Sequence, residues 1–295
     1  MNTTQTKQEL KPLASYSIFK AYITVPFHWS SLKMLLKYLR TVIFDFFLLQ
    51  FSVKFGWRKI PVLSVDHELD ARVPFVPGKV GVYLDFINFW IRPMSFLIER
   101  FGVKKAVPYC TEYLRVIEEC YCQAARMYKF RMSTTRRPPV GKNKHFRMIH
   151  IMDPHYLCVP SLHVTIVSLA YNFYRKVFDE LDLPQEEKDF YNKELYEGAL
   201  AITETVLYVK QHSVNCIPAA LYMCLYVLKD TFSIEGAIKF IDDLFVSSSD
   251  IAGEDKKSIH EYIGFFFERL LLEGCNEDDW VIPVQRWIIS YIPFN

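Results

Sequence analysis

The string Pro160-Ser161-Leu162-His163 combines residue types that can bind an anion and move a proton. Pro160 is typical of the first position of a helix, and the backbone amides that follow such a position have no helical partner. Free amides at a helix start can hold an anion, and the Ser161 hydroxyl would add a donor. The His163 imidazole titrates near neutral pH, so it can act as an acid or a base. This segment predicts an anion site with a proton donor in it.

A second histidine, His212, lies in the segment 205–218 together with Lys210. If the segment is one helix, Thr205 and Cys216 share the face of His212, each within about 40° of it. Lys210 lies about 200° from His212, so both reach one ligand only if the helix ends or distorts there, or if the long lysine stem curls around. Taken alone, either histidine is also explained as a core residue with its hydrogen bonds satisfied.

A loop rich in Arg and Lys, 131–144, precedes both histidines and contains Arg137-Pro138. Taken alone, this loop is typical of a solvated basic segment at a membrane surface. Its position before the two histidine segments gives the chain three cationic or imidazole clusters in a fixed order. We base the functional interpretation on the order of these three clusters.

The three clusters resemble the signature of the type 2 phosphatidic acid phosphatases, a family that includes lipid phosphotransferases and vanadium haloperoxidases. That signature is a basic residue before Arg-Pro, then Pro-Ser-x-His, then Ser-Arg with a His six residues after the Arg and an Asp four residues later. Arg137-Pro138 resembles the first element, and Pro160-Ser161-Leu162-His163 resembles the second, with Leu where the signature has Gly. Thr205 to His212 resembles the third. The resemblance covers residues 130–225 and does not extend to either end of the chain.

The resemblance implies an all-α, multi-helix bundle of the phosphatidic acid phosphatase and haloperoxidase kind, embedded in a membrane. His212 would attack phosphorus and form a phosphohistidine, while His163 would protonate the leaving alkoxide. Arg137, Ser161 and Lys210 would bind the phosphoryl oxygens, and an arginine is well suited to a pair of such oxygens. No metal and no cofactor are expected, because side chains supply the positive charge.

Two positions depart from the signature. Val206 stands where the family has Arg, and Cys216 stands where it has the Asp that holds the attacking imidazole in one tautomer. Cys216 and Asn215 are the possible orienting residues, although a thiol or an amide supplies no charge to stabilise an imidazolium. These departures keep a weak or inactive relative as an alternative.

The leading hypothesis is therefore a phosphohydrolase that acts on a lipid phosphate or diphosphate through a phosphohistidine. One alternative is a lipid head-group phosphotransferase, which would share the same first step with a hydroxyl acceptor. Another is a non-catalytic relative that keeps the pocket for binding or packing. The expected partners are a lipid phosphate substrate and a membrane; the oligomeric state is not predicted.

Along its length, the sequence is a series of apolar stretches with helical spacing. Two segments, Pro154–Tyr174 and Gln211–Leu228, contain no Asp, Glu, Lys or Arg and approach the roughly 20 residues that a membrane span requires. We therefore expect an integral, multi-pass membrane protein. The charges of the stretch Tyr109–Phe130 keep a peripheral location as the alternative, because charges are costly in lipid.

The chain divides by pattern into a polar N-terminal segment (1–31), a helical phosphatase-like core (32–230) and a C-terminal helical appendage (231–295). With 51% apolar residues and 23% charged residues, the composition excludes disorder. The net charge of +2 gives no field that would hold a polyanion, so we expect no nucleic-acid partner. The seven Cys are an odd number without a paired framework, which predicts reduced thiols. The polar start lacks the form of a cleavable signal, so we expect a chain that begins in the cytosol.

Overall fold

A computed structural model describes residues 10–139 and 144–294. The expected all-α class is confirmed, because the described part of the chain is mostly helical with one short pair of strands. The helices are α1 (Phe19–Thr24), α2 (Trp29–Thr41), α3 (Leu48–Lys54), α4 (Val80–Leu84), α5 (Phe86–Phe101), α6 (Val103–Phe130), α7 (Lys144–Met152), α8 (Leu162–Glu180), α9 (Gln185–Tyr208), α10 (Cys216–Val227), α11 (Ile234–Asp243), α12 (Gly253–Gly274) and α13 (Val281–Ser290). The strands are β1 (Val62–Ser64) and β2 (Met132–Thr134).

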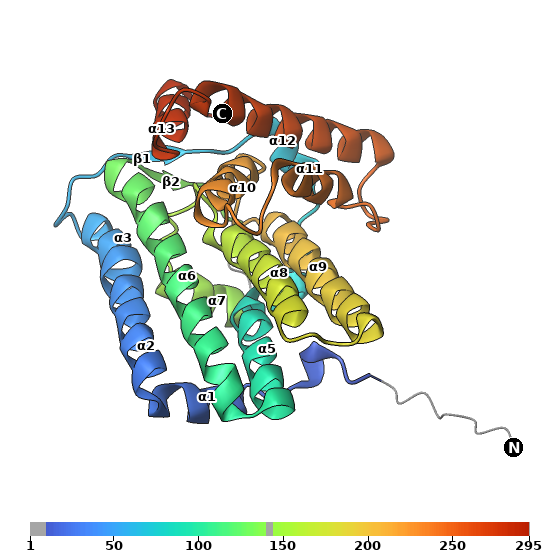
Figure 1. The fold of residues 1–295 in the computed structure, drawn as a ribbon. Coiled ribbons are helices and arrows are strands. Elements are labelled where there is room, and N and C mark those ends of the chain that lie inside the picture. Colours follow the sequence, from blue (N-terminus) through green and yellow to red (C-terminus); the bar gives the residue numbers. More distant parts are fainter. Residues whose placement is uncertain (1–9, 140–143, 295) are drawn as a thin grey trace, which may run out of the picture.

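The long helix α6 runs through the bundle between two groups of helices (Figure 1). On one side, α2 packs along α6 and continues through a π-helical turn, Val42–Phe47, into α3. On the other side, α5 and α8 pack against α6, and α9 packs on α8. The helices α10 to α13 lie across one end of these helices (Figure 1), and α12 packs on α10.

The two charge-free segments are parts of the protein core. Helix α8 begins only at Leu162 and runs on to Glu180, and α10 has 12 residues, about 18 Å at 1.5 Å per residue. Both are largely buried against neighbouring helices, which accounts for their apolar composition. Within residues 10–139 and 144–294, no helix is both long enough and apolar enough to cross a bilayer. The expected embedding of the bundle in a membrane is therefore not supported.

The N-terminal residues are part of the bundle from Leu13 onward. The Glu194 carboxylate on α9 accepts hydrogen bonds from the backbone N–H groups of Leu13 and Ala14, both at 2.7 Å. The Ser95 hydroxyl on α5 accepts one from the N–H of Ala21 at 3.1 Å. The segment expected to be polar, 1–31, thus contains α1 and the start of α2, while its first nine residues lie outside the described part.

A small parallel strand pair joins three segments that are far apart in sequence. Val62 pairs with Met132 and Ser64 pairs with Thr134, so β1 lies beside β2. Ser133 also forms a bridge to Leu157, and its hydroxyl accepts a hydrogen bond from the Val159 N–H at 2.8 Å. These contacts hold the chain just before Arg137 against the chain just before Ser161.

Candidate functional site

The structure brings His163 and His212 together. Their ring centroids are 5.5 Å apart, at 67° between ring planes, and both line a cavity of about 40 Å³. His163 lies in the first turn of α8, where its ring packs against Tyr83 at 4.5 Å and Phe86 at 4.3 Å. A cavity of this size holds a few water molecules at most, so a bound phosphate ester would require its aromatic walls to move.

A sharp turn after α9 carries His212 to this position. The segment 205–218 is not one helix: α9 ends at Tyr208, and Lys210 adopts a left-handed conformation with φ of 54°. The N–H groups of Gln211 and His212 then both donate to the carbonyl of Val206, at 2.9 and 3.2 Å. The chain therefore reverses direction within this turn before α10 begins.

Lys210 is not brought to the imidazoles. Its ammonium donates to the backbone carbonyls of Asp70 and Val73. With the helix ended and the backbone in the left-handed region, the side chain leaves the turn on the side of the loop between β1 and α4. Lys210 thus fixes the turn to that loop, and burial lowers its pKa.

Ser161 lies directly beside His212. It is the N-cap of α8, and its hydroxyl is 3.3 Å from Nε2 of His212. Pro160 therefore precedes the N-cap instead of occupying the first helical position. The Ser161 N–H donates to the carbonyl of Cys216 at 3.4 Å, so this amide is already used within the protein.

Arg137 reaches the same cluster through Asp153. Its guanidinium donates to the backbone carbonyl of Asp153 at 2.9 Å and to the carboxylate at 2.7 Å. The Arg137 side chain is 11% exposed, and its Nε has no partner within the described residues. The pKa of Asp153 falls well below its usual range, since hydrogen bonds from His155 and the Arg137 charge outweigh the effect of burial.

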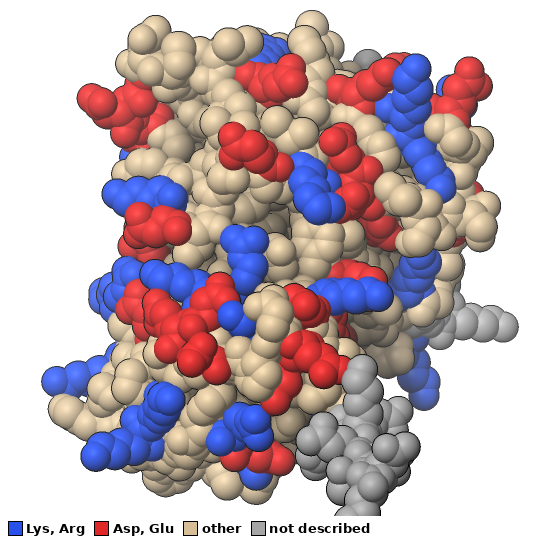
Figure 2. Space-filling model, turned by 45° about the vertical axis from the view of Figure 1, so that its right-hand side comes forward, with Lys and Arg blue, Asp and Glu red and all other residues tan. Residues whose placement is uncertain are grey.

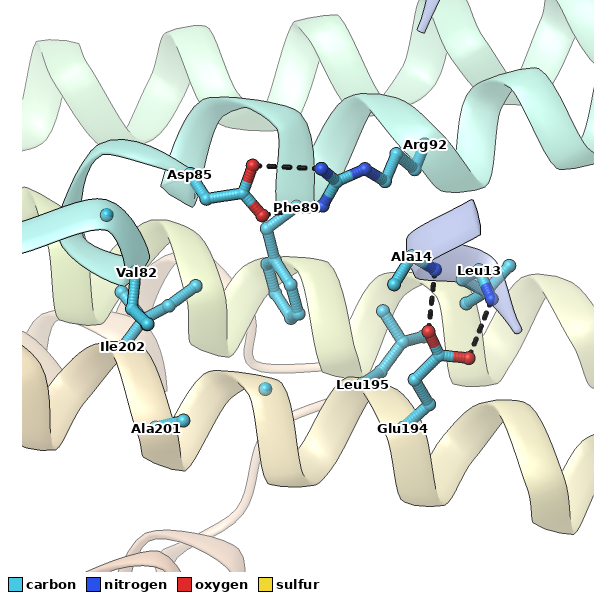
Figure 3. A pocket seen from close by; sticks show the side chains of 12 residues that line it. Leu13, Ala14, Val82, Asp85, Phe89, Arg92, Glu194, Leu195, Ala201 and Ile202 are labelled. Carbon is cyan, nitrogen blue, oxygen red and sulfur yellow. Dashed lines mark hydrogen bonds and ion pairs between the residues drawn. The ribbon is translucent and has the colours of Figure 1, made fainter. Parts of the chain in front are cut away.

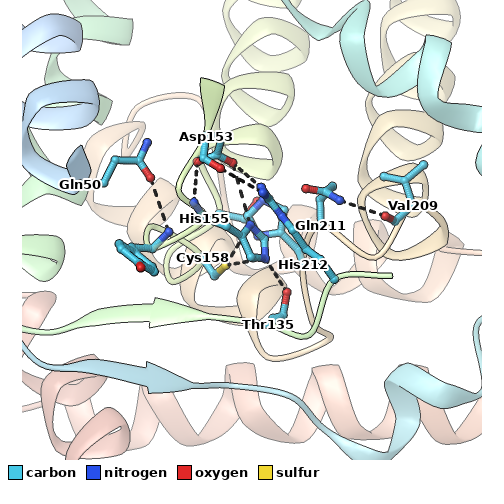
Figure 4. A network of polar contacts seen from close by, with 11 residues as sticks. Gln50, Thr135, Asp153, His155, Cys158, Val209, Gln211 and His212 are labelled. Carbon is cyan, nitrogen blue, oxygen red and sulfur yellow. Dashed lines mark hydrogen bonds and ion pairs between the residues drawn. The ribbon is translucent and has the colours of Figure 1, made fainter. Parts of the chain in front are cut away.

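A third imidazole, His155, completes the cluster (Figure 4). Its ring centroid is 6.5 Å from that of His212, and its Nε2 is 2.7 Å from the Thr135 hydroxyl. The sulfur of Cys158 lies 3.6 Å from the same nitrogen. The Asp153 carboxylate accepts a hydrogen bond from the backbone N–H of His155 at 2.9 Å, and the ring Nδ1 of His155 lies 3.9 Å from that carboxylate. His155 takes a left-handed φ of 67° in the loop that leads to α8. The sequence pattern marks this loop as a cluster but contains no signal that singles out His155.

The three imidazoles differ in their proton affinity. Burial would lower the pKa of His155, but the charges of Cys158 and Asp153 outweigh burial and raise it to about 9. The pKa of Cys158 falls to about 6 despite burial, because the Cys216 thiol donates to it and His155 is charged. Burial lowers the pKa of His163 to about 4 and places that of His212 well below its usual value. These shifts favour the charged form of His155 and the neutral forms of His163 and His212.

Neither possible orienting residue contacts the His212 ring. The Asn215 amide donates to the carbonyl of Val65 and to the Tyr291 hydroxyl, and its oxygen accepts from the Tyr262 hydroxyl at 2.6 Å. The Cys216 sulfur accepts a hydrogen bond from the Ser213 N–H at 3.4 Å. The Nδ1 atom of His212 has no hydrogen-bond partner in the described part of the chain. The protein thus supplies no carboxylate at the position where the signature has one.

A larger cavity than the one at the imidazoles lies elsewhere, and the charged side chains that line it are paired or hydrogen-bonded. It has about 410 Å³ and lies between α4 and α5 on one side and α9 on the other (Figure 3). Its ionic groups are occupied, since Asp85 pairs with Arg92 and Glu194 accepts the N–H groups of the N-terminal segment. This cavity is an apolar space with satisfied polar groups.

Asp70 links the loop after β1 to the turn that carries His212, and its titration is testable. Its carboxylate accepts the N–H groups of Val214 and His67, both at 2.8 Å, and burial raises its pKa from 3.8 to about 6. A raised pKa contributes stability that is complete below pH 3.8 and is lost as the pH rises through about 6. We expect the wild type to lose stability relative to Asp70→Asn between pH 4 and pH 7. Urea unfolding of both proteins across this range measures the difference, and a constant difference would contradict the burial of this charge.

No protein-family model, no curated protein and no solved structure matches this chain. Within the described residues, no group of three or more His, Cys, Asp or Glu side chains is arranged to hold a metal ion. On the face in Figure 2, cationic and anionic side chains alternate without a patch of one sign. The functional interpretation therefore depends on the geometry of the imidazole cluster.

Proposed function

We propose that this protein is a phosphohydrolase of the type 2 phosphatidic acid phosphatase kind, acting on a lipid phosphate or diphosphate through a phosphohistidine. The observation that supports this most is the approach of His163 and His212, with 5.5 Å between ring centroids, and of Ser161, whose hydroxyl is 3.3 Å from His212 Nε2. A nucleophile, a proton donor and a hydroxyl donor around one small space are the groups that phosphoryl transfer requires. We also propose that the protein works at a membrane, where such substrates reside.

In the proposed reaction, the neutral His212 attacks phosphorus through Nε2, which faces Ser161. The bond from phosphorus to the ester oxygen breaks, and the alkoxide takes a proton from His163. Water then attacks the phosphohistidine, gives its proton to His163 and restores His212 with release of phosphate. The pKa of His163 is lowered to about 4. His163 would therefore take up a proton only when an anionic substrate is bound beside it, and it would then donate this proton to the alkoxide.

Arg137 and His155 are the cations that would bind the phosphoryl oxygens. In the free protein the Arg137 guanidinium donates to the Asp153 carboxylate, and the His155 Nδ1 lies 3.9 Å from it; substrate binding would exchange part of that pairing for contacts with the phosphate. His155 then takes the role for which Lys210 was expected. Because His212 Nδ1 has no carboxylate partner, we expect slow turnover. Loss of the equivalent carboxylate costs about 10⁴ in rate in a serine protease.

The direct experiment is phosphate release from radiolabelled phosphatidic acid in detergent micelles by the purified protein, measured beside transfer of the labelled phosphoryl group to an added diacylglycerol acceptor of different acyl-chain length. Hydrolysis with an acid-labile, alkali-stable phosphoenzyme supports the proposal. Transfer without release would identify the phosphotransferase alternative. The absence of both activities and of a phosphoenzyme would favour a non-catalytic relative.

Vanadate should inhibit the activity, because it can form a trigonal-bipyramidal adduct on His212 that resembles the transition state. Activity should persist in EDTA, because Arg137 and His155 provide the positive charge. Initial rates with increasing vanadate, with and without EDTA, test both expectations. Insensitivity to millimolar vanadate, or complete loss of activity in EDTA, would point to another mechanism.

A further inference from the structure

The N-terminal helices and the turns that flank them carry a set of exposed aromatic and aliphatic side chains. We call it the N-terminal apolar face and define it by Phe27, Trp29, Leu36, Ile43, Phe55 and Trp57. Phe27, Trp29 and Trp57 are 80%, 71% and 74% exposed. Trp29, Leu36 and Ile43 belong to the element formed by α2, the π-helical turn and α3, which lies at the edge of the bundle with α6 on its inner side (Figure 1). Phe27 lies just before this element, and Phe55 and Trp57 lie just after it.

Helical spacing places three of these side chains on one side of the element. Trp29, Leu36 and Ile43 follow one another at intervals of seven residues, which places them on one side of a helix. The opposite side is buried, as Thr41 and Leu49 illustrate. The helical element from 29 to 54 is about 39 Å long at 1.5 Å per residue. A buried carboxylate on α6, Glu118, receives hydrogen bonds from Lys37 and Thr41 and fixes the element to the bundle.

The same segment has a strong excess of positive charge. Residues 19–59 contain one acidic side chain, Asp45, which pairs with Lys129 on α6. The segment's cations are Lys20, Lys33, Lys37, Arg40, Lys54, Arg58 and Lys59. Within the described part of the chain, no ion pair is formed by Lys33, Arg40, Lys54, Arg58 or Lys59. The Lys33 ammonium lies over the Trp29 ring, and the Lys54 ammonium lies over the Phe51 ring. The excess is local, because the whole chain has a net charge of only +2.

Exposed Trp and Phe side chains interleaved with Lys and Arg are typical of a helix that lies in the interface of an anionic bilayer. A second copy of this chain is a poorer occupant, because a symmetric contact would place two positively charged faces against each other. We propose that the N-terminal apolar face is a docking surface for anionic phospholipid bilayers. The helices lie flat in the head-group region with their aromatic side chains inserted.

The docking element also forms one wall of the candidate site. Phe46, in the π-helical turn, lines the cavity that contains His163 and His212, while its neighbour Phe44 is exposed on the outer side. Gln50 accepts a hydrogen bond from the Tyr156 N–H, next to His155. A bilayer on the outer side would therefore lie one helix thickness from the imidazole cluster. This link to catalysis rests on the proposed function, whereas the docking itself does not.

Vesicle sedimentation tests the docking. The wild type should bind phosphatidylcholine vesicles that contain phosphatidylglycerol, bind pure phosphatidylcholine more weakly, and be released by high salt. The variant Phe27→Ser/Trp29→Ser/Trp57→Ser should lose at least about tenfold in affinity, since its side chains supply the inserted apolar surface. The variant Lys33→Glu/Arg40→Glu should lose most of the preference for anionic vesicles.

Control variants change exposed apolar or basic side chains on other faces. Phe265→Ser/Leu272→Ser/Ile289→Ser replaces apolar side chains that are 61–74% exposed on α12 and α13, and should bind as the wild type does. Lys193→Glu/Lys257→Glu is the matched charge control. Equal binding by the wild type and the first serine variant would overturn the proposal, as would no binding at low salt. If the wild type forms a concentration-dependent dimer, and only Phe27→Ser/Trp29→Ser/Trp57→Ser abolishes it, the face would be assigned to a second copy of the chain.

A soluble short-chain phosphate ester separates docking from catalysis. The serine variant of the N-terminal apolar face should hydrolyse this substrate as fast as the wild type, and should be slower only when the substrate is presented in vesicles. A wild type that binds vesicles without hydrolysing either substrate would refute the proposed function and leave the docking surface intact.

Discussion

Replacing His212 with alanine should reduce phosphate release by at least about 10³-fold and abolish the acid-labile phosphoenzyme. The expectation follows from the removal of the attacking nitrogen, since loss of a covalent nucleophile costs that much or more in enzymes that form such intermediates. Rapid quench with radiolabelled substrate, followed by acid and alkali treatment of the protein, measures the phosphoenzyme directly.

The matched control is His145→Ala, at the opposite end of α7 from Asp153. It should retain both the rate and the phosphoenzyme. Thermal unfolding of both variants separates a catalytic loss from a folding defect, because His212 is buried. A phosphoenzyme that persists in His212→Ala would assign the nucleophile to another residue, with His155 and His163 the first to examine.

Replacing His163 with glutamine should slow hydrolysis of an alkyl phosphate by about 10² to 10⁴, the usual contribution of a positioned general acid. The effect should depend on the leaving group. A nitrophenyl ester needs little protonation when its bond to phosphorus breaks, so its hydrolysis should change far less. Comparison of kcat/KM for the two esters in the wild type and the variant gives the measurement.

An equal loss for both esters would mean that His163 acts through packing, because its ring lies between Tyr83 and Phe86. The variant Tyr83→Phe keeps the stacked ring and leaves His163 in place, so it should reduce neither rate appreciably. Together the two variants distinguish proton donation from support of the cavity wall.

Much of the fold follows from residue patterns, but the environment of the helices does not. Apolar periodicity predicts the helices: α6 contains the whole stretch Tyr109–Phe130, whereas α8 contains only the part of Pro154–Tyr174 from Leu162 onward. The charge-free segments Pro154–Tyr174 and Gln211–Leu228 were expected to cross a membrane, whereas they contribute to helices inside the bundle. A protein core and a lipid core select the same residue types, so composition alone does not separate the two environments.

The candidate site was predictable where the chemistry is local. The string from Pro160 to His163 predicts a helix start near Ser161, and the family resemblance that the three clusters carry implies that His163 and His212 meet. The direction of Lys210 was not predictable, because it depends on a left-handed backbone and on carbonyls of the distant residues Asp70 and Val73. The role of His155 depends in the same way on Thr135, which the strand pair brings beside it.

The hydrogen bonds of Asn215 make the two ends of the fold interdependent. Its amide joins the turn after His212 to Tyr262 on α12 and to Tyr291, and the Tyr291 hydroxyl donates to the carbonyl of Asp66. Helix α12 and the residue after α13 therefore support the turn that carries His212. A protein shortened before α12 would lose the geometry of residues far upstream of the cut, so expression of residues 32–230 alone is a poor route to an active fragment.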